Sequence, residues 1–187
     1  LLRHRNLTTA FAPLPADLRA RAAELTASLP PEDARLDALI TQRVAAFAQA
    51  KPEPARGAGV FAQQCAACHR LGGAGGVIGP TLDGIAARGA ARLIEDILDP
   101  NRNVDPAFRL ASVTLRSGET RLGMNLREDA QAYHLTDPST GREESVPKSQ
   151  TTASGVGAGS PMPAVFENSM SEKDFFDLLA HLLRPTT

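Results

Sequence analysis

The sequence contains no tryptophan and one tyrosine, and only 4% of its 187 residues are aromatic. A protein-binding surface built on aromatic anchors is therefore not expected. The two signs of charge are nearly balanced, because 20 basic and 21 acidic residues give a formal net charge of −1. Nucleic-acid binding needs a basic surface that neutralises phosphates, so we expect no nucleic-acid partner.

Long apolar runs are also missing. No segment is long and apolar enough to cross a bilayer, so we expect no membrane span in this chain. The opening residues, LLRHRNLTTA, lack the apolar core of a signal peptide. The length allows one medium domain or two small ones.

Cysteine is scarce too, and its placement is the most informative feature of the chain. The only two cysteines, Cys65 and Cys68, lie in the pentapeptide CAACH, where His69 follows the second one. A C-x-x-C pair can be a redox-active dithiol, half of a zinc site or, when histidine follows, the attachment point of a c-type haem.

The residues around the motif favour the haem interpretation. A dithiol of the thioredoxin type expects a βαβ pattern, whereas this motif has a helical pattern before it and glycines after it. A zinc site needs further ligands at short spacing, but the remaining histidines are scattered, at positions His4, His134 and His181. Haem attachment needs only the motif, because the cysteines add to the porphyrin vinyl groups and the histidine binds the iron.

Haem attachment would also constrain location. Because c-type haem is normally attached outside the cytoplasm, we expect a periplasmic or otherwise extracytoplasmic protein. The opening residues carry no signal, so we expect this chain to be the mature or excised part of a longer precursor.

Apolar spacing predicts helices in the N-terminal part of the chain. Residues 15–29 place Leu18, Leu25 and Leu29 on one face, and the pattern repeats over residues 32–50 after Pro30 and Pro31. We predict a helical extension over residues 1–54 that contains a helical hairpin. It is either the last repeat of a helical array or an extension packed on the domain that follows.

Three more helices are predicted in the remainder. One runs from Ala58 into CAACH, one covers ARLIEDIL and ends at Asp99-Pro100, and one covers SEKDFFDLLAHLL with Ser171 as its N-cap. The Gly-rich segment LGGAGGVIGP is expected to be irregular. Several apolar residues could belong to a haem pocket or to an ordinary core, namely Phe61, Leu82, Ile85, Leu93 and Ile97.

The apolar period changes at about residue 108. Alternation in RLASVTLRSGETRLGMNLRED predicts two strands joined at Ser117-Gly118, and a weaker pattern predicts a second hairpin around Asp137-Pro138. We therefore predict a small antiparallel β unit over about residues 108–147. Residues 149–160, SQTTASGVGAGS, are predicted to form a loop.

Taken together, the stretch GAGVFAQQCAACHRLGGAGGVIGPTLDGI and the final LLAHLL resemble a class I c-type cytochrome. The chain is most similar to the haem-binding domain with a β insertion found at the C terminus of bacterial proteins built from β-propellers and HEAT-like repeats. The segment EDILDPNRNVDPAFR, the hairpins and the late SPMP support this resemblance, which covers about residues 57–184. It implies a mainly α cytochrome c fold over residues 55–187, with the β insertion at about 108–147.

The resemblance also implies a haem site. One covalent haem c would be bound by Cys65 and Cys68, His69 would ligate the iron, and the carbonyl of Pro80 would accept a hydrogen bond from the His69 ring. His181 falls where the family usually has an aromatic residue, which implies a packing role.

The residues alone leave the sixth iron ligand open among Met124, Met162, Met170, His134 and His181. Met124 lies within strand alternation and Met170 precedes a helix N-cap, so both are more simply packing residues. Met162 is favoured, since it lies between two prolines that would stiffen the backbone around a ligand. Much of that preference rests on the resemblance, and His134 is the second choice.

These expectations define the predicted function. Two protein ligands on the iron are typical of single-electron transfer without transformation of a substrate, and a thioether ligand raises the reduction potential. By resemblance, the electron donor would be a dehydrogenase, and the acceptor would be another cytochrome or the respiratory chain. Two alternatives remain open: a haem-based sensor or enzyme with an exchangeable sixth position, and a thiol or zinc protein without haem.

Overall fold

The computed structural model describes residues 15–26, 32–157 and 159–185, and the chain divides into two compact units, residues 1–48 and 49–187. The first unit contains the helices α2 (Ala16–Thr26) and α3 (Glu32–Phe47), so both N-terminal helices form as predicted. Leu18 and Leu25 are each 52% exposed, however, and the predicted apolar face of α2 is therefore not buried. Leu29, predicted on the same face, and the predicted helix break at Pro30 and Pro31 lie outside the described residues.

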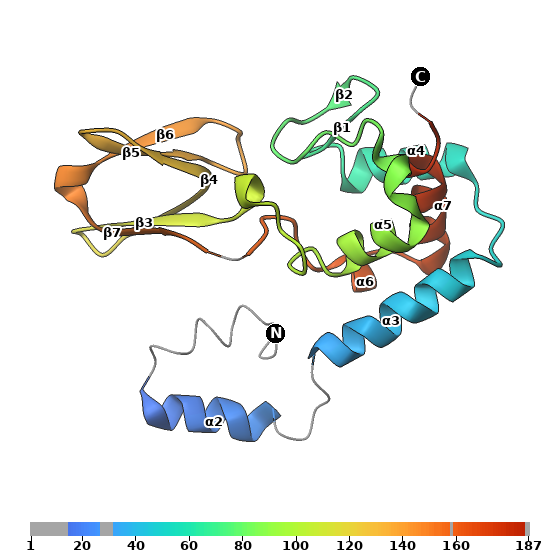
Figure 1. Ribbon diagram of the computed structural model, residues 1–187, viewed down its shortest axis with the longest axis horizontal. Helices are drawn as coiled ribbons and strands as arrows, with labels where there is room; N and C mark the ends of the chain where they lie inside the picture. The colour runs from blue at the N-terminus through green and yellow to red at the C-terminus, as the bar shows by residue number, and fades with distance from the viewer. Residues whose placement is uncertain (1–14, 27–31, 158, 186–187) are drawn as a thin grey trace. The chain divides into compact units, whose positions relative to one another are not determined.

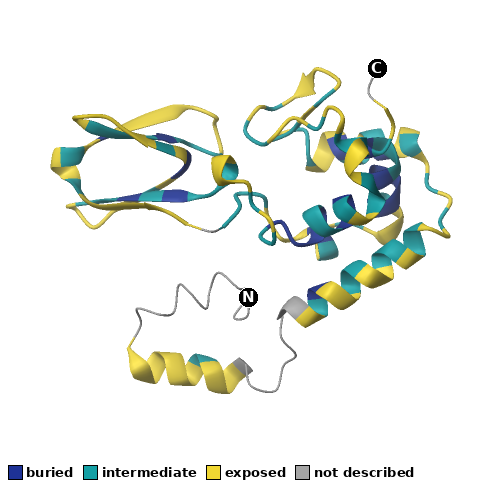
Figure 2. Ribbon diagram, in the orientation of Figure 1, coloured by how far each residue is buried: buried dark blue, intermediate teal, exposed yellow. Residues whose placement is uncertain are grey.

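The second unit contains the helices α4 (Pro54–Gln64), α5 (Gly89–Leu98), α6 (Phe166–Ser169) and α7 (Glu172–Leu182). Their buried side chains gather where α4 and α5 pack against α7 (Figure 2). The main members of this core are Phe61, Leu93, Ile94, Ile97, Phe175, Leu178, Leu179 and Leu182. Two predicted helix boundaries are confirmed, because α5 ends at Asp99 and the Ser171 side chain caps α7.

Helices α4 and α7 cross at Gly57. A Cβ atom at this position would lie 1.9 Å from the carbonyl oxygen of Asp177, so only glycine allows the two backbones to come so close. This crossing fixes α4 and therefore the CAACH segment that directly follows it.

A buried carboxylate ties the start of α4 to α7. Asp177 is fully buried and accepts hydrogen bonds from the Glu53 backbone N–H at 2.7 Å, Arg56 Nε at 2.6 Å and Lys173 Nζ at 3.1 Å. Burial alone would raise the pKa of Asp177, but these three donors outweigh it and lower the pKa. The carboxylate is thus charged at neutral pH and has its hydrogen bonds satisfied.

Between α5 and α6 the chain forms a five-stranded antiparallel sheet in the order β6-β5-β4-β3-β7 (Figure 1). The strands are β3 (Ala111–Leu115), β4 (Thr120–Glu128), β5 (Ala132–Thr136), β6 (Glu143–Pro147) and β7 (Thr151–Val156). Its small core consists of Ala111, Val113, Leu135 and Val146. Both predicted hairpins are present, with β3 paired to β4 and β5 paired to β6.

The structure corrects three predictions. The expected loop at 149–160 contains β7, which pairs with β3 alone and is exposed along most of its length, so its sequence has no alternation to recognise. The Gly-rich segment contains a minimal hairpin, β1 (Arg70–Leu71) with β2 (Ala74–Gly75). Mainly α is only partly right as a fold class, because the sheet is sizeable and extends to Val156.

Candidate haem-binding site

The CAACH segment forms a tight turn at the end of α4. Cys65 caps this helix, and its backbone N–H donates to Phe61 O at 2.9 Å. The Cys65 carbonyl in turn accepts from the N–H groups of Cys68 at 3.1 Å and His69 at 2.9 Å. Both thiols and the imidazole are therefore carried by one hydrogen-bonded turn.

The Gly-rich loop folds back onto this turn. Gly76 N–H donates to the carbonyl of Ala66 and Gly79 N–H to the carbonyl of Cys68, both at 2.8 Å. A Cβ atom on Gly79 would lie 2.6 Å from Cε1 of the His69 ring. The absence of a side chain at Gly79 thus lets the loop backbone lie directly against the imidazole.

The His69 ring is oriented by Pro80. Its Nδ1 lies 2.9 Å from the Pro80 carbonyl oxygen. A carbonyl can only accept, so Nδ1 carries the proton and donates it, which leaves the lone pair on Nε2 for a metal. This is the arrangement in which a ligating histidine is held by a hydrogen bond from its second nitrogen.

The two cysteines are free and partly buried. Burial, with a smaller contribution from Cys68, raises the pKa of the Cys65 thiol to about 11. Redox-active dithiols depend on a lowered thiol pKa, so the dithiol interpretation loses support. The donor set of two thiols and an imidazole with a free Nε2 fits a haem attached through thioethers.

The described residues form no zinc site. Over residues 15–26, 32–157 and 159–185, no group of three or more His, Cys, Asp or Glu side chains is arranged to hold a metal ion. His4 lies outside these ranges.

Two of the alternative sixth-ligand candidates are engaged in the sheet. Met124 lies in β4 and is 1% exposed, as expected for a core residue. His134 in β5 has both ring nitrogens occupied, with Nδ1 2.9 Å from Ser145 Oγ and Nε2 2.9 Å from Asp129 Oδ2. His134 could ligate iron only after one of these contacts is broken.

The other two alternatives lie among the helices. His181 is in α7 with its ring 5.9 Å from that of Phe61, and burial together with Arg184 lowers its pKa. Met170 follows α6 directly and is partly buried. Both positions are those of packing residues.

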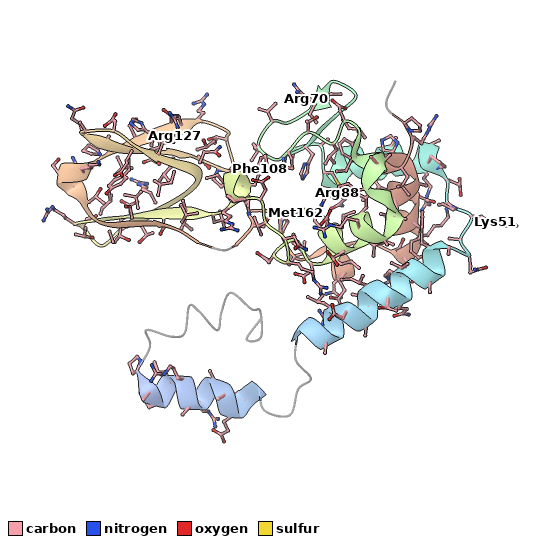
Figure 3. All side chains as sticks on the ribbon, in the orientation of Figure 1. Lys51, Arg70, Arg88, Phe108, Arg127 and Met162 are labelled. Carbon is pink, nitrogen blue, oxygen red and sulfur yellow. The ribbon has the colours of Figure 1, made fainter. Side chains whose placement is uncertain are left out.

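Met162 lies on the segment that leads from β7 to α6 (Figure 3). Its side chain is partly buried, and its backbone N–H donates to Ser160 Oγ at 3.1 Å. The Ser160 N–H donates in turn to Asn101 Oδ1 at 2.9 Å. Sequence patterns did not single out Asn101 or Ser160, because a contact between polar turn residues 59 positions apart leaves no periodic signal.

Comparison with known proteins agrees with this assembly of residues. No curated protein matches the chain. Residues 54–137 match the family model of cytochrome c, a range that begins with α4, includes the CAACH turn and α5, and ends just after β5. Residues 54–137 are therefore similar to the cytochrome c family, whose members generally carry covalently bound haem c and transfer electrons.

Proposed function

We propose that this protein transfers single electrons through one haem c, bound covalently at Cys65 and Cys68 and ligated by His69 and Met162. The observation that carries the proposal is the His69 ring, held between Gly79 and the Pro80 carbonyl and directly preceded by two free thiols. The similarity of residues 54–137 to the cytochrome c family supports the same cofactor.

Haem c supplies an iron atom that changes its oxidation state by one electron. Pro80 fixes the tautomer of His69 and increases its basicity through the hydrogen bond to Nδ1. The thioether of Met162 favours ferrous iron, and the buried side chains of Phe61 and Leu93 keep water away from that part of the domain. These residues set a reduction potential and transform no substrate.

The wider role follows from the domain type. Cytochrome c domains are usually extracytoplasmic, and among the described residues no helix is long and apolar enough to cross a membrane. We propose a periplasmic protein or domain that accepts electrons from a dehydrogenase and passes them to another cytochrome or to the respiratory chain. The sheet between α5 and α6 and the late SPMP support the subtype joined to β-propellers and HEAT-like repeats.

The ligand assignment is tested by the absorption spectrum of the oxidised protein, produced in the periplasm of cells with haem maturation. We expect haem bands with the weak far-red band of methionine bound to ferric iron. The far-red band should disappear in Met162→Ala and persist in Met170→Ala, a matched control at another partly buried methionine. Persistence of the band in Met162→Ala would show that Met162 is not the iron ligand.

Carbon monoxide separates electron transfer from sensing or catalysis. A closed site should bind it poorly in the reduced wild-type protein and readily in Met162→Ala. Ready binding to the wild-type protein would instead favour a haem-based sensor or enzyme.

A further inference from the structure

We propose that Asn101 and Ser160 position the methionine loop, residues 159–163, and thereby set how firmly the Met162 thioether is held at the iron. This inference rests on the proposed function, because it requires Met162 to be the ligand. It assigns a role to two residues that are not among the proposed haem-binding residues.

The backbone of the methionine loop has few donors, and two side chains take them up. Pro161 and Pro163 have no N–H group, so between residues 160 and 163 only Ser160 and Met162 can donate from the backbone. The first donates to Asn101 Oδ1 at 2.9 Å and the second to Ser160 Oγ at 3.1 Å, and both bonds are partly buried. The position of Met162 is therefore connected to Asn101 through two consecutive hydrogen bonds.

Asn101 lies directly beyond a helix that is packed into the domain core. It lies three residues beyond the end of α5, whose residues Ile94 and Leu98 are buried in the helical core. The neighbouring turn is closed by Asp99, which is 3% exposed and accepts from Arg102 Nε at 2.9 Å. The Asn101 amide is thus presented to the loop from a fixed backbone.

The start of the methionine loop is also held at the base of the sheet. Leu110 N–H donates to the Gly159 carbonyl and Gly157 N–H donates to the Leu110 carbonyl, both at 2.8 Å. Directly beyond this point Ala111 pairs with Val156, so the first and last strands of the insertion meet there. The loop consequently leaves the sheet at a defined point, and Ser160 is bound to Asn101 two residues before Met162.

These two hydrogen bonds would control how readily an external ligand replaces the Met162 thioether. An external ligand can bind only when the thioether has left the iron, so its apparent affinity is the intrinsic affinity multiplied by the open fraction. Loss of one hydrogen bond of ordinary strength from the closed loop should increase the open fraction about three- to tenfold. Asn101 and Ser160 would then keep the iron site closed, as electron transfer without ligand exchange requires.

The test is an imidazole titration of the ferric holoprotein, followed by absorption. Asn101→Ala and Ser160→Ala should each bind imidazole about three- to tenfold more tightly than the wild-type protein. Asn101→Asp keeps an acceptor oxygen and should stay closer to the wild type than Asn101→Ala. Asn103→Ala is the matched control, because Asn103 is exposed and donates to Glu95 Oε1 at 3.1 Å, away from the methionine loop; its affinity should not change.

Met162→Ala distinguishes a failure of the proposed iron ligation from a failure of the proposed positioning role. If it binds imidazole no more tightly than the wild type and neither shows the far-red band, Met162 is not the ligand and the proposed ligation fails. If it binds more tightly while Asn101→Ala and Ser160→Ala match the control, the ligation stands and the positioning role is overturned. Should Asn101→Ala fail to fold, Ser160→Ala decides the outcome alone.

Discussion

The CAACH turn and the methionine loop are both irregular segments, but they are held in different ways. The turn is organised by backbone hydrogen bonds among residues 61–79 and by the contact between His69 and Pro80. The methionine loop depends on Asn101 and Leu110, which lie far away in the sequence. A local network of backbone bonds is expected to resist opening, whereas a loop held by a few bonds, most of them to distant residues, opens more readily.

The largest effect is expected where α4, which carries the turn, crosses α7. Gly57→Ala should lower the free energy of unfolding by about 3 kcal/mol, because the new Cβ overlaps the Asp177 carbonyl and forces the helices apart. Gly59→Ala is the control, since no neighbouring atom lies within 4 Å of its added Cβ. Urea unfolding followed by circular dichroism measures both, and equal stabilities would show that the crossing is not tightly packed.

A smaller loss is expected inside the turn itself. In Gly79→Ala the added methyl group would lie 2.6 Å from the His69 ring, so the ring must move away from the Pro80 carbonyl. We expect destabilisation of about 2 kcal/mol and a lower yield of holoprotein. The β7 variant Gly155→Ala, which has open space around it, should behave like the wild type. An unchanged Gly79→Ala protein would mean that the loop is not in contact with the imidazole.

Denaturant should separate the two segments directly. We expect the far-red band of the oxidised protein to disappear at a urea concentration below that of global unfolding, because opening of the methionine loop costs less free energy than unfolding of the whole domain. Absorption and circular dichroism recorded on the same samples measure the two transitions. Coincident transitions would show that the loop opens only when the whole domain unfolds.

The smallest effect concerns acid. The pKa of Asp177 is lowered in the folded protein, so its stabilising contribution is complete above the unfolded value of about 3.9 and is lost as the pH falls through the folded pKa. The wild-type melting temperature should therefore decrease below about pH 4, and the decrease should be shallower in Asp177→Asn. If the melting temperatures of the two proteins decreased in parallel with pH, Asp177 would not contribute to the loss of stability in acid.

The same contrast explains what the sequence could predict. The CAACH motif, the α5 boundary at Asp99 and the Ser171 cap depend on neighbouring residues, and local patterns reveal them. Strand β7 was missed because an exposed edge strand has no buried face and so no alternation. The reverse error occurred in α2, where helical spacing of leucines indicated a buried face but Leu18 and Leu25 are half exposed.

Contacts between distant residues could not be predicted from patterns. Nothing in the spacing of the glycines distinguishes Gly57, which meets Asp177 in another helix, from Gly59, which meets nothing. The hydrogen bond from Ser160 to Asn101 likewise joins residues that are distant in the sequence, and no local pattern indicates it. Such contacts depend on how the elements pack, and each residue alone would be typical of a helix or a turn.

Covalent binding of haem at the CAACH turn can be tested by mass spectrometry under denaturing conditions, which removes any haem that is not covalently attached. The protein should be produced in the periplasm of cells with haem maturation, beside a variant in which Cys65 and Cys68 are both replaced by alanine. We predict that the wild-type chain carries the added mass of one haem and that the variant carries none. A wild-type chain of unmodified mass, without haem absorption, would show that CAACH does not bind haem covalently.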